Sequence, residues 1–257
     1  CGRTKGDAAR RRFVVRQFRA EMWFEDAFCG TPDWMAIRCI LIKCLLEGLE
    51  ASIGDFATAF MSTPLKPEDE IYIEPPPEVK GDGSFVWKLD KALNGLVLAS
   101  KRFQEFITSL LTAQLGFEKF AAMPTLFNHK EQQTSLAIHV DDPLLATRGG
   151  WAQNFWHTLG KWIEVKEYEV IGGEPKVFLG TVLYRDGASF VEMPKPGYIE
   201  SMVKVAEDMG EKIQGSRKVS TPSDKLDLTK ESELVEATPE FHTAYRQIVG
   251  KGQFILP

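Results

Sequence analysis

The stretch LAIHVDDPLLA (residues 136–146) decides the fold, because it places two adjacent carboxylates, Asp141 and Asp142, between two short apolar runs. Short apolar runs on either side of a polar tetrapeptide predict a β-hairpin. Adjacent aspartates repel each other in a tight apolar turn unless a cation or solvent offsets their charge. One solution is a divalent metal site, in which carboxylate oxygens hold Mg²⁺ against substrate phosphates. The other interpretation is a solvated turn, because Asp favours turns through its own backbone hydrogen bonds.

Length and composition describe an ordinary globular protein. The chain has 257 residues, with 44% hydrophobic and 26% charged residues, enough for one large domain or two smaller ones. Its longest apolar stretch, residues 34–46, is interrupted by Arg38 and Lys43, which argues against a transmembrane span. Residues 1–20 are basic and lack the apolar segment of a secretory signal. We therefore expect a protein that is neither secreted nor membrane-bound.

The cysteines and the first residue suggest an intracellular fragment. The four cysteines show no paired metal spacing, and we expect them to be reduced thiols rather than zinc ligands; they are Cys1, Cys29, Cys39 and Cys44. The chain begins with Cys1 rather than Met, which suggests a piece of a longer product.

Charge is unevenly distributed along the chain. The net charge of −5 argues against a nucleic-acid partner, but residues 1–20 hold seven basic side chains and only one acid, Asp7. A basic arm on an acidic body suits contact with a polyanion, whereas the alternative is a solvated or disordered tail. Arg12, Val14 and Arg16 alternate with two apolar residues, which predicts a strand with basic residues on one face.

Apolar spacing predicts mixed helices and strands. A helix should begin at the segment Thr31-Pro32-Asp33, with an N-cap oxygen and an early proline, and end near Gly48. Further helices are expected over residues 98–115, 151–159 and 198–209, and strands over 51–56, 71–73 and 85–87 and around 165, 178 and 190. The acidic run KESELVEATPE (230–240) predicts a linker. Without regular βαβ alternation, we expect an α+β fold with an antiparallel sheet.

A second carboxylate segment completes a possible catalytic site. Phosphoryl transfer with two metal ions needs carboxylates from separate segments converging on ions about 3.5–4 Å apart. Asp55 ends a predicted strand and is the candidate partner of Asp141 and Asp142. Phe60, five residues later, could abut the sugar of a nucleotide. Taken singly, Asp55 could equally be a strand-end or helix-cap residue, and Phe60 a core residue.

Five ordered motifs carry a family resemblance. DFATAF, IYIEPP, FVWKLDKALNGL, HVDD and KVFLG resemble the reverse transcriptase domain of copia-type (Pseudoviridae-like) LTR retrotransposon polyproteins. The similarity continues upstream through ARRRFVVRQF and downstream through PGYIESMVKV, VSTP and AYRQIVG. It implies a right-hand polymerase fold, with fingers and palm interleaved over about residues 1–180 and a thumb-like part over about 181–229. Residues 230–257 would then be a linker and the start of a segment leading to an RNase H domain.

The resemblance also implies residue roles. The catalytic, metal-binding carboxylates would be Asp55, Asp141 and Asp142, holding two Mg²⁺ ions, with Mn²⁺ a possible substitute. Phe60 would be the aromatic gate that excludes a ribose 2′-hydroxyl. The other substrate-binding residues would be Arg12, Arg16, Asn94 and Gly95. Primer-binding residues would be His139, Phe178, Leu179 and Gly180. Lys166 lies near a position that could protonate the pyrophosphate leaving group.

The implied activity is RNA-directed DNA synthesis, in which a primer 3′-hydroxyl attacks the α-phosphate of a dNTP. The implied partners are an RNA or DNA template with its primer, and dNTPs. Other polyprotein domains, RNase H and integrase, are expected but absent from this chain. The expected location is a cytoplasmic particle or the nucleus.

Several residues depart from the family pattern and leave alternatives open. His139 and Asn94 stand where Tyr is usual, and Leu98 and Ser100 replace Gln and Pro. Pro143 stands where a β-branched or long apolar residue is usual and removes a backbone donor. The first alternative is therefore a catalytically inactive retrotransposon relic that retains the fold and at most binds nucleic acid. Another palm-type nucleotidyl transferase, such as a cyclase, is opposed by the basic strand and the primer-terminus element.

Overall fold

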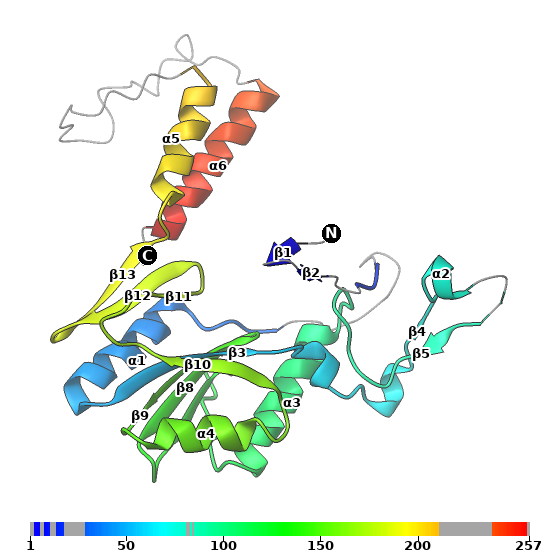
Figure 1. Ribbon diagram of the computed structural model, residues 1–257, viewed down its shortest axis with the longest axis horizontal. Helices are drawn as coiled ribbons and strands as arrows, with labels where there is room; N and C mark the ends of the chain where they lie inside the picture. The colour runs from blue at the N-terminus through cyan, green and yellow to red at the C-terminus, as the bar shows by residue number, and fades with distance from the viewer. Residues whose placement is uncertain are drawn as a thin grey trace. The chain divides into compact units, whose positions relative to one another are not determined.

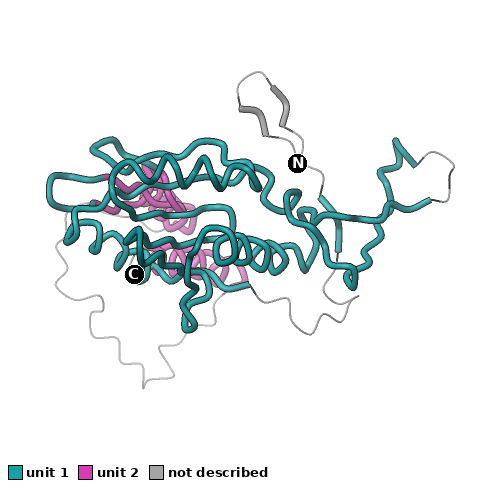
Figure 2. The backbone as a smooth tube through the Cα atoms, turned by 90° about the horizontal axis from the view of Figure 1, so that it is seen from below, with its two compact units in different colours: residues 1–176, 185–190 teal, residues 177–184, 191–257 magenta. Residues whose placement is uncertain are grey.

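The computed structural model describes residues 3–5, 8–10, 14–17, 29–80, 83, 85–210 and 238–255 (Figure 1). The chain forms two compact units, residues 1–176 with 185–190, and residues 177–184 with 191–257 (Figure 2). Arg12 and the VSTP motif lie outside the described residues. Within the described ranges, no helix combines the length and apolar character needed to cross a membrane.

A six-stranded antiparallel sheet forms the centre of the first unit. Its strand order is β10-β3-β9-β8-β7-β6. The strands are β3 (Glu50–Phe56), β6 (Glu118–Lys119), β7 (Leu126–His129), β8 (Thr134–His139), β9 (Asp142–Thr147) and β10 (Val165–Val170). Together with the helices, this sheet confirms the predicted α+β class and its antiparallel sheet.

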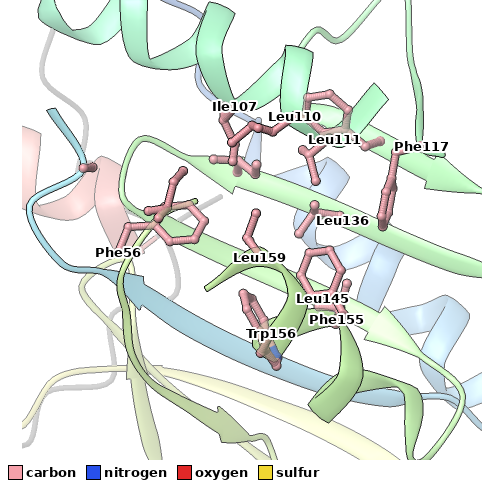
Figure 3. Packing of buried hydrophobic residues seen from close by; sticks show 14 of the residues in the cluster. Phe56, Ile107, Leu110, Leu111, Phe117, Leu136, Leu145, Phe155, Trp156 and Leu159 are labelled. Carbon is pink, nitrogen blue, oxygen red and sulfur yellow. The ribbon is translucent and has the colours of Figure 1, made fainter. Parts of the chain in front are cut away.

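Helices cover both faces of this sheet. Side chains alternate between the two faces along β8 and β9, and those on both faces are buried. Leu136 and Leu145 join a buried cluster with side chains of α3 (Ala99–Ala113) and α4 (Trp151–Leu159) (Figure 3). The intervening Ala137 points to the opposite face, and α1 (Trp34–Glu47) contacts β8, β9 and β3. Burial on both faces explains why the strands around the HVDD motif are so apolar.

The first helix has a different N-cap from the one predicted. The Asp33 side chain accepts a hydrogen bond from the Met35 amide at 3.0 Å, so Asp33 is the N-cap and Pro32 lies outside the helix. Gly48 ends the helix with φ +66°, as its position in the sequence suggested. The helix was therefore predicted correctly, but its start was placed two residues too early.

A smaller apolar cluster supports a two-stranded hairpin, β4 (Tyr72–Ile73) and β5 (Trp87–Lys88). Ile71, Ile73, Ala92, Leu96 and Ala99 form this cluster, and partly buried side chains pack against it. Two 3-10 turns, η2 (Phe60–Ser62) and η3 (Pro67–Asp69), lead from β3 to the hairpin. The short helix α2 (Pro77–Lys80) and the strand pair β1 (Arg3–Lys5) and β2 (Ala8–Arg10) complete the first unit.

The predicted basic strand is wrong over its described part. Residues 14–17 form no strand; instead, the Val15 amide donates a hydrogen bond to the Asn94 carbonyl at 2.8 Å. Val15 packs on the small apolar cluster and Arg16 is exposed. Alternation of inward and outward side chains is therefore present, but within the described ranges no neighbouring strand supplies a ladder of hydrogen bonds.

Gly95 is required where this segment docks. Its φ is +94°, and a Cβ atom there would lie 2.0 Å from the Val15 carbonyl oxygen. Gly95→Ala is therefore expected to lower the free energy of unfolding by about 2–3 kcal/mol, through the unfavourable φ and the clash. Gly48→Ala is the matched control, since its φ is also positive but no atom lies within 4 Å of the added carbon; it should lose only about 1 kcal/mol. Urea unfolding measures both, and equal losses would contradict the close approach of Val15.

The second unit contains two helices, α5 (Tyr198–Asp208) and α6 (Pro239–Ile255), which contact each other. The Lys251 ammonium donates to the Ser201 hydroxyl at 2.6 Å and lies 5.0 Å from the Tyr198 ring centroid. Strands β11 (Lys176–Phe178), β12 (Thr181–Asp186) and β13 (Ser189–Pro194) form a three-stranded sheet, of which residues 177–184 and 191–194 belong to the second unit. The predicted linker over residues 230–240 overlaps the start of α6, because Pro239 and Glu240 begin that helix.

Candidate functional site

The hairpin of β8 and β9 carries the two adjacent aspartates at its tip. Pairing extends as far as His139 and Asp142, so Val140 and Asp141 form a two-residue turn. Val140 has φ +55°, a conformation that costs a β-branched residue free energy and is kept only where surrounding structure imposes it. The Asp141 carbonyl accepts a hydrogen bond from the Phe56 amide at 3.0 Å. This bond ties the turn to the end of β3, directly beside Asp55.

Asp55 reaches the hairpin from the neighbouring strand. It is the penultimate residue of β3, whose partner strands are β9 on one side and β10 on the other. The Lys166 ammonium, from β10, forms an ion pair with the Asp55 carboxylate. Two carboxylate segments distant in sequence therefore meet at one end of the sheet, and Lys166, a lysine predicted to be functional, lies on β10, the strand on the other side of β3 from this hairpin.

The unusual Pro143 is accommodated by a glycine on β3. A Cβ atom at Gly54 would lie 3.3 Å from the Pro143 ring and 3.0 Å from the Trp156 ring. The Trp156 indole N–H donates to the Ser52 hydroxyl at 3.1 Å and is buried. Pairing of β3 with β9 is recorded only up to Ile53 and Leu144, as expected where proline has no N–H to donate. Close packing thus replaces a ladder hydrogen bond beneath the carboxylates.

Mutual repulsion among the carboxylates is visible at Asp142. Burial, followed by the charges of Asp141 and Asp55, raises the pKa of Asp142 to about 6, although His139 and Lys166 act in the opposite direction. A carboxyl group with a pKa this high marks a place where a cation would be electrostatically favoured.

The three carboxylates are suitable ligands for a hard divalent cation, but in the described residues they are not arranged as a complete metal site. Carboxylate oxygens are the ligands that Mg²⁺ prefers. In the part of the chain that the structure describes, no three side chains of His, Cys, Asp or Glu are grouped as a metal site. The Lys166 ammonium is the cation that Asp55 contacts. The residues therefore fit a metal in chemistry and approximate position, with Lys166 as the stand-in positive charge.

The raised pKa of Asp142 predicts how stability depends on pH. The pKa of about 6 keeps this proton on the folded protein up to about pH 6, whereas the ordinary pKa of an aspartate side chain is 3.8. The folded state therefore binds more protons in this window, and stability falls as pH rises through it. Asp142→Asn should remove that fall and raise the thermal midpoint by a few degrees near pH 7. Thermal unfolding at about pH 4 and pH 7, with a chelator present, would contradict this if wild type and variant changed in parallel.

A cleft of about 910 Å³ lies beside the hairpin and gathers several of the predicted residues. Its lining includes Asp141, Lys166, Phe60 and Asn94. Phe60 packs against both apolar clusters and makes an edge contact with Phe103, with ring centroids 6.2 Å apart. The ring is therefore held in place from behind while one side faces the cleft.

The cleft also contains residues to which the sequence assigned no role. They are Phe56, Ala57, Thr58, Ala59, Met61, Ile73, Trp87, Leu89, Leu93, Val140 and Glu164. Trp87 belongs to the motif FVWKLDKALNGL. In a strand, Val86 and Trp87 lie on opposite faces, and this alternation was the feature of the sequence that could have indicated a cleft-facing position for one of them. Which face of the hairpin Trp87 occupies depends on its pairing with β4, which sequence alone does not fix.

The remaining predicted residues have different surroundings. Gly95 is explained by the close approach of Val15, and His139 is half-buried opposite Asp142. Phe178, Leu179 and Gly180 lie in the second unit. Leu179 and Gly180 have φ +45° and +88°, the pattern of a tight two-residue hairpin turn. That segment is therefore a hairpin, as the resemblance implied, but its relation to the carboxylates stays a prediction.

Comparison with known proteins gives the family. Residues 5–222 match the family model for reverse transcriptase (RNA-dependent DNA polymerase). The chain is 28% identical over 219 residues to the retrovirus-related Pol polyprotein from transposon TNT 1-94 of Nicotiana tabacum, covering 82% of this chain. It spans only 16% of that polyprotein.

Solved structures with a partial, low-scoring similarity to this chain include a reverse transcriptase and a telomerase. A foamy viral protease-reverse transcriptase, in complex with an RNA/DNA hybrid, is 12% identical, with a TM-score of 0.38, over 63% of this chain and 20% of the other. An apo telomerase from Candida tropicalis is 13% identical, with a TM-score of 0.39, over 64% of this chain and 40% of the other. The family match covers most of the chain, so the protein belongs to the reverse transcriptase (RNA-dependent DNA polymerase) family, in its copia-type branch.

Proposed function

We propose that this chain catalyses RNA-directed DNA synthesis, extending a primer with dNTPs on an RNA or DNA template. The observation that carries the proposal is the convergence of Asp55, Asp141 and Asp142 at one end of the sheet, next to the cleft that Phe60 and Lys166 line. Members of the family generally use divalent metal ions, and this carboxylate set supplies suitable ligands.

Each side chain at the site has a distinct task in the proposed reaction. Asp55, Asp141 and Asp142 would hold two Mg²⁺ ions, or Mn²⁺, which activate the primer hydroxyl and neutralise the pyrophosphate when bound. The Lys166 ammonium lines the cleft, so it can face the triphosphate. It could donate a proton to the leaving group once Asp55 binds a metal ion instead of Lys166. Lys166 would thus have two tasks: it neutralises Asp55 when no metal ion is bound, and it acts as a general acid toward the pyrophosphate.

Residues outside the carboxylate cluster would bind the substrates. Asn94 lines the cleft and can contact the nucleotide or the templating base, while Gly95 lets residues 14–17 approach it closely. Arg16, with Arg12, would neutralise the triphosphate. The primer terminus would meet His139 and the segment Phe178, Leu179 and Gly180.

We assign fingers and palm to about residues 1–180 and a thumb-like part to the residues that follow. The thumb-like part would span about residues 181–229, followed by the linker segment over residues 230–257. The contact of α6 with α5 within the second unit supports adding residues 239–255 to the thumb-like part. RNase H and integrase domains would be partners from the same polyprotein, and the place of action would be a cytoplasmic particle or the nucleus.

Primer extension tests the proposal directly. Purified chain, an RNA template with an annealed DNA primer, dNTPs and Mg²⁺ should yield extended primer. Complete absence of extension would overturn the proposal and favour the inactive relic, which predicts salt-sensitive nucleic-acid binding that Arg16→Ala weakens. Release of a cyclic nucleotide without template would instead favour the cyclase alternative.

Phe60 gives a prediction about sugar selection. Its ring lines the cleft and is backed by Phe103, so it cannot easily move away from a ribose 2′-hydroxyl. Phe60→Ala is expected to reduce discrimination between dNTP and rNTP by at least about tenfold in kcat/KM, mainly by improving rNTP use. Met61→Ala, at the neighbouring cleft residue, is the matched control. Unchanged discrimination in Phe60→Ala would contradict the gate role.

A further inference from the structure

The β4–β5 hairpin turns one aromatic residue toward the cleft and another away from it. Ile73 pairs with Trp87, and Tyr72 pairs with Lys88. Side chains directly opposite each other in a sheet lie on the same face, and neighbouring pairs lie on opposite faces. Ile73 and Trp87 line the cleft. Tyr72 is 53% exposed, with the Lys88 ammonium 5.8 Å from its ring centroid. The hairpin therefore presents an indole ring inward and a phenol ring outward.

The cleft is chemically divided. Asp141, Glu164 and Lys166 supply its charged groups, whereas Ile73, Trp87, Leu89 and Leu93 supply an apolar wall. Trp87, Leu89 and Leu93 also pack against the buried cluster of Ile71, Ile73, Ala92, Leu96 and Ala99. The indole of Trp87 is half-buried, and the hydrophobic cluster behind it fixes its position.

A nucleotide matches this division, since its phosphates are charged and its base is a flat aromatic ring. We propose that Trp87 is the residue on which the base of the incoming nucleotide stacks, which extends the proposed polymerase function to a specific base-binding wall. With the phosphates near Lys166, the base would lie toward the apolar wall. Stacking on an aromatic ring tolerates every base, because each has a π-face. A stacking wall is therefore suited to a template-directed enzyme that must accept all four nucleotides.

Binding without chemistry separates stacking from phosphate contacts. Each of the four dNTPs, and tripolyphosphate as a probe without a base, would be titrated into wild-type chain with Mg²⁺ and no primer. Trp87→Leu should weaken dNTP affinity by about 5- to 100-fold, the loss expected for one stacked base. Tripolyphosphate affinity should stay unchanged, and Trp87→Phe should retain most of the dNTP affinity because an aromatic ring is kept.

Fluorescence and a matched aromatic variant complete the experiment. The chain contains six tryptophans, so quenching by dNTP should shrink in Trp87→Phe relative to wild type. Tyr72→Ala, on the outward face, should leave both affinity and quenching unaltered. Thermal unfolding of all variants identifies any that fail to fold, in which case Trp87→Phe alone decides through the loss of quenching.

Several outcomes would overturn the inference. Equal weakening of dNTP and tripolyphosphate in Trp87→Leu would show a structural role. Unchanged dNTP binding combined with a raised KM in primer extension would place the stack on the templating base instead. Absence of dNTP binding by the wild-type chain would also overturn it. Nucleotide binding that depends on Trp87 in a chain without primer extension would support the stack while the proposed polymerase function failed.

Discussion

Asp141→Asn is expected to lower primer extension by at least about 10³-fold, since a metal-coordinating carboxylate contributes several kcal/mol of transition-state stabilisation. Asp141 is exposed at the tip of the hairpin and lines the cleft. Its backbone carbonyl, not its side chain, accepts the hydrogen bond from Phe56. Asparagine has the same shape and leaves that bond in place, so the fold should survive while the charge is lost.

The loss should be confined to catalysis. Asp186→Asn, an exposed aspartate at the end of β12, is the matched control and should extend primer at the wild-type rate. Thermal midpoints of both variants should remain close to that of wild type. Extension by Asp141→Asn at the wild-type rate would show that synthesis does not use this carboxylate. The hairpin would then return to its other interpretation, a solvated turn.

Arg102→Ala is expected to destabilise the first unit by about 3–5 kcal/mol, because it strands a buried carboxylate. The Arg102 guanidinium donates to both Asp69 oxygens, at 2.8 and 2.5 Å, and to Glu105 at 2.7 Å. The Asp69 side chain is only 2% exposed. These bonds join η3, which leads into the β4–β5 hairpin, to helix α3. Loss of Arg102 would thus loosen the wall that holds Trp87 as well as lower global stability.

The dependence of the free energy of unfolding on acidic pH tests the Arg102–Asp69 pair. Burial is the largest influence and alone would raise the pKa of Asp69. The hydrogen bonds from Arg102 and from the Lys66 amide, together with the charges of Arg102 and Lys66, outweigh it and hold the pKa below its usual value. A carboxylate with a lowered pKa stabilises the folded state above its unfolded pKa and loses that contribution as pH falls through the folded pKa. Denaturant unfolding near pH 7 and pH 3 should therefore show a larger penalty for Arg102→Ala at the higher pH.

An exposed ion pair provides the contrast. Lys88 and Glu70 are 3.3 Å apart, and both side chains are more than half exposed. Lys88→Ala should change stability by no more than about 1 kcal/mol. A loss as large as that of Arg102→Ala would contradict the argument that burial, rather than ion pairing itself, makes Arg102 important.

Prediction from sequence succeeded where a local pattern is also the physical cause. The helix over residues 151–159 and the hairpin around Asp141 follow from side-chain periodicity, and the structure has both. It failed at residues 14–17, where alternation was present but no strand of the described residues pairs with this segment. It also assigned Pro239 and Glu240 to a linker, because an acidic, weakly hydrophobic run gives no sign that a following helix will pack on α5.

The sequence by itself determined the family, the α+β class and the identities of the candidate carboxylates, since ordered motifs and apolar spacing are properties of the linear chain. Tertiary structure alone decided that Lys166 pairs with Asp55, that Gly95 admits Val15, and that Trp87 faces the cleft. The physical reason is that these contacts depend on strand register and on close packing between segments far apart in sequence. A slip of one residue in β5 would place Trp87 opposite Tyr72 and turn it to the outward face, with the sequence unchanged.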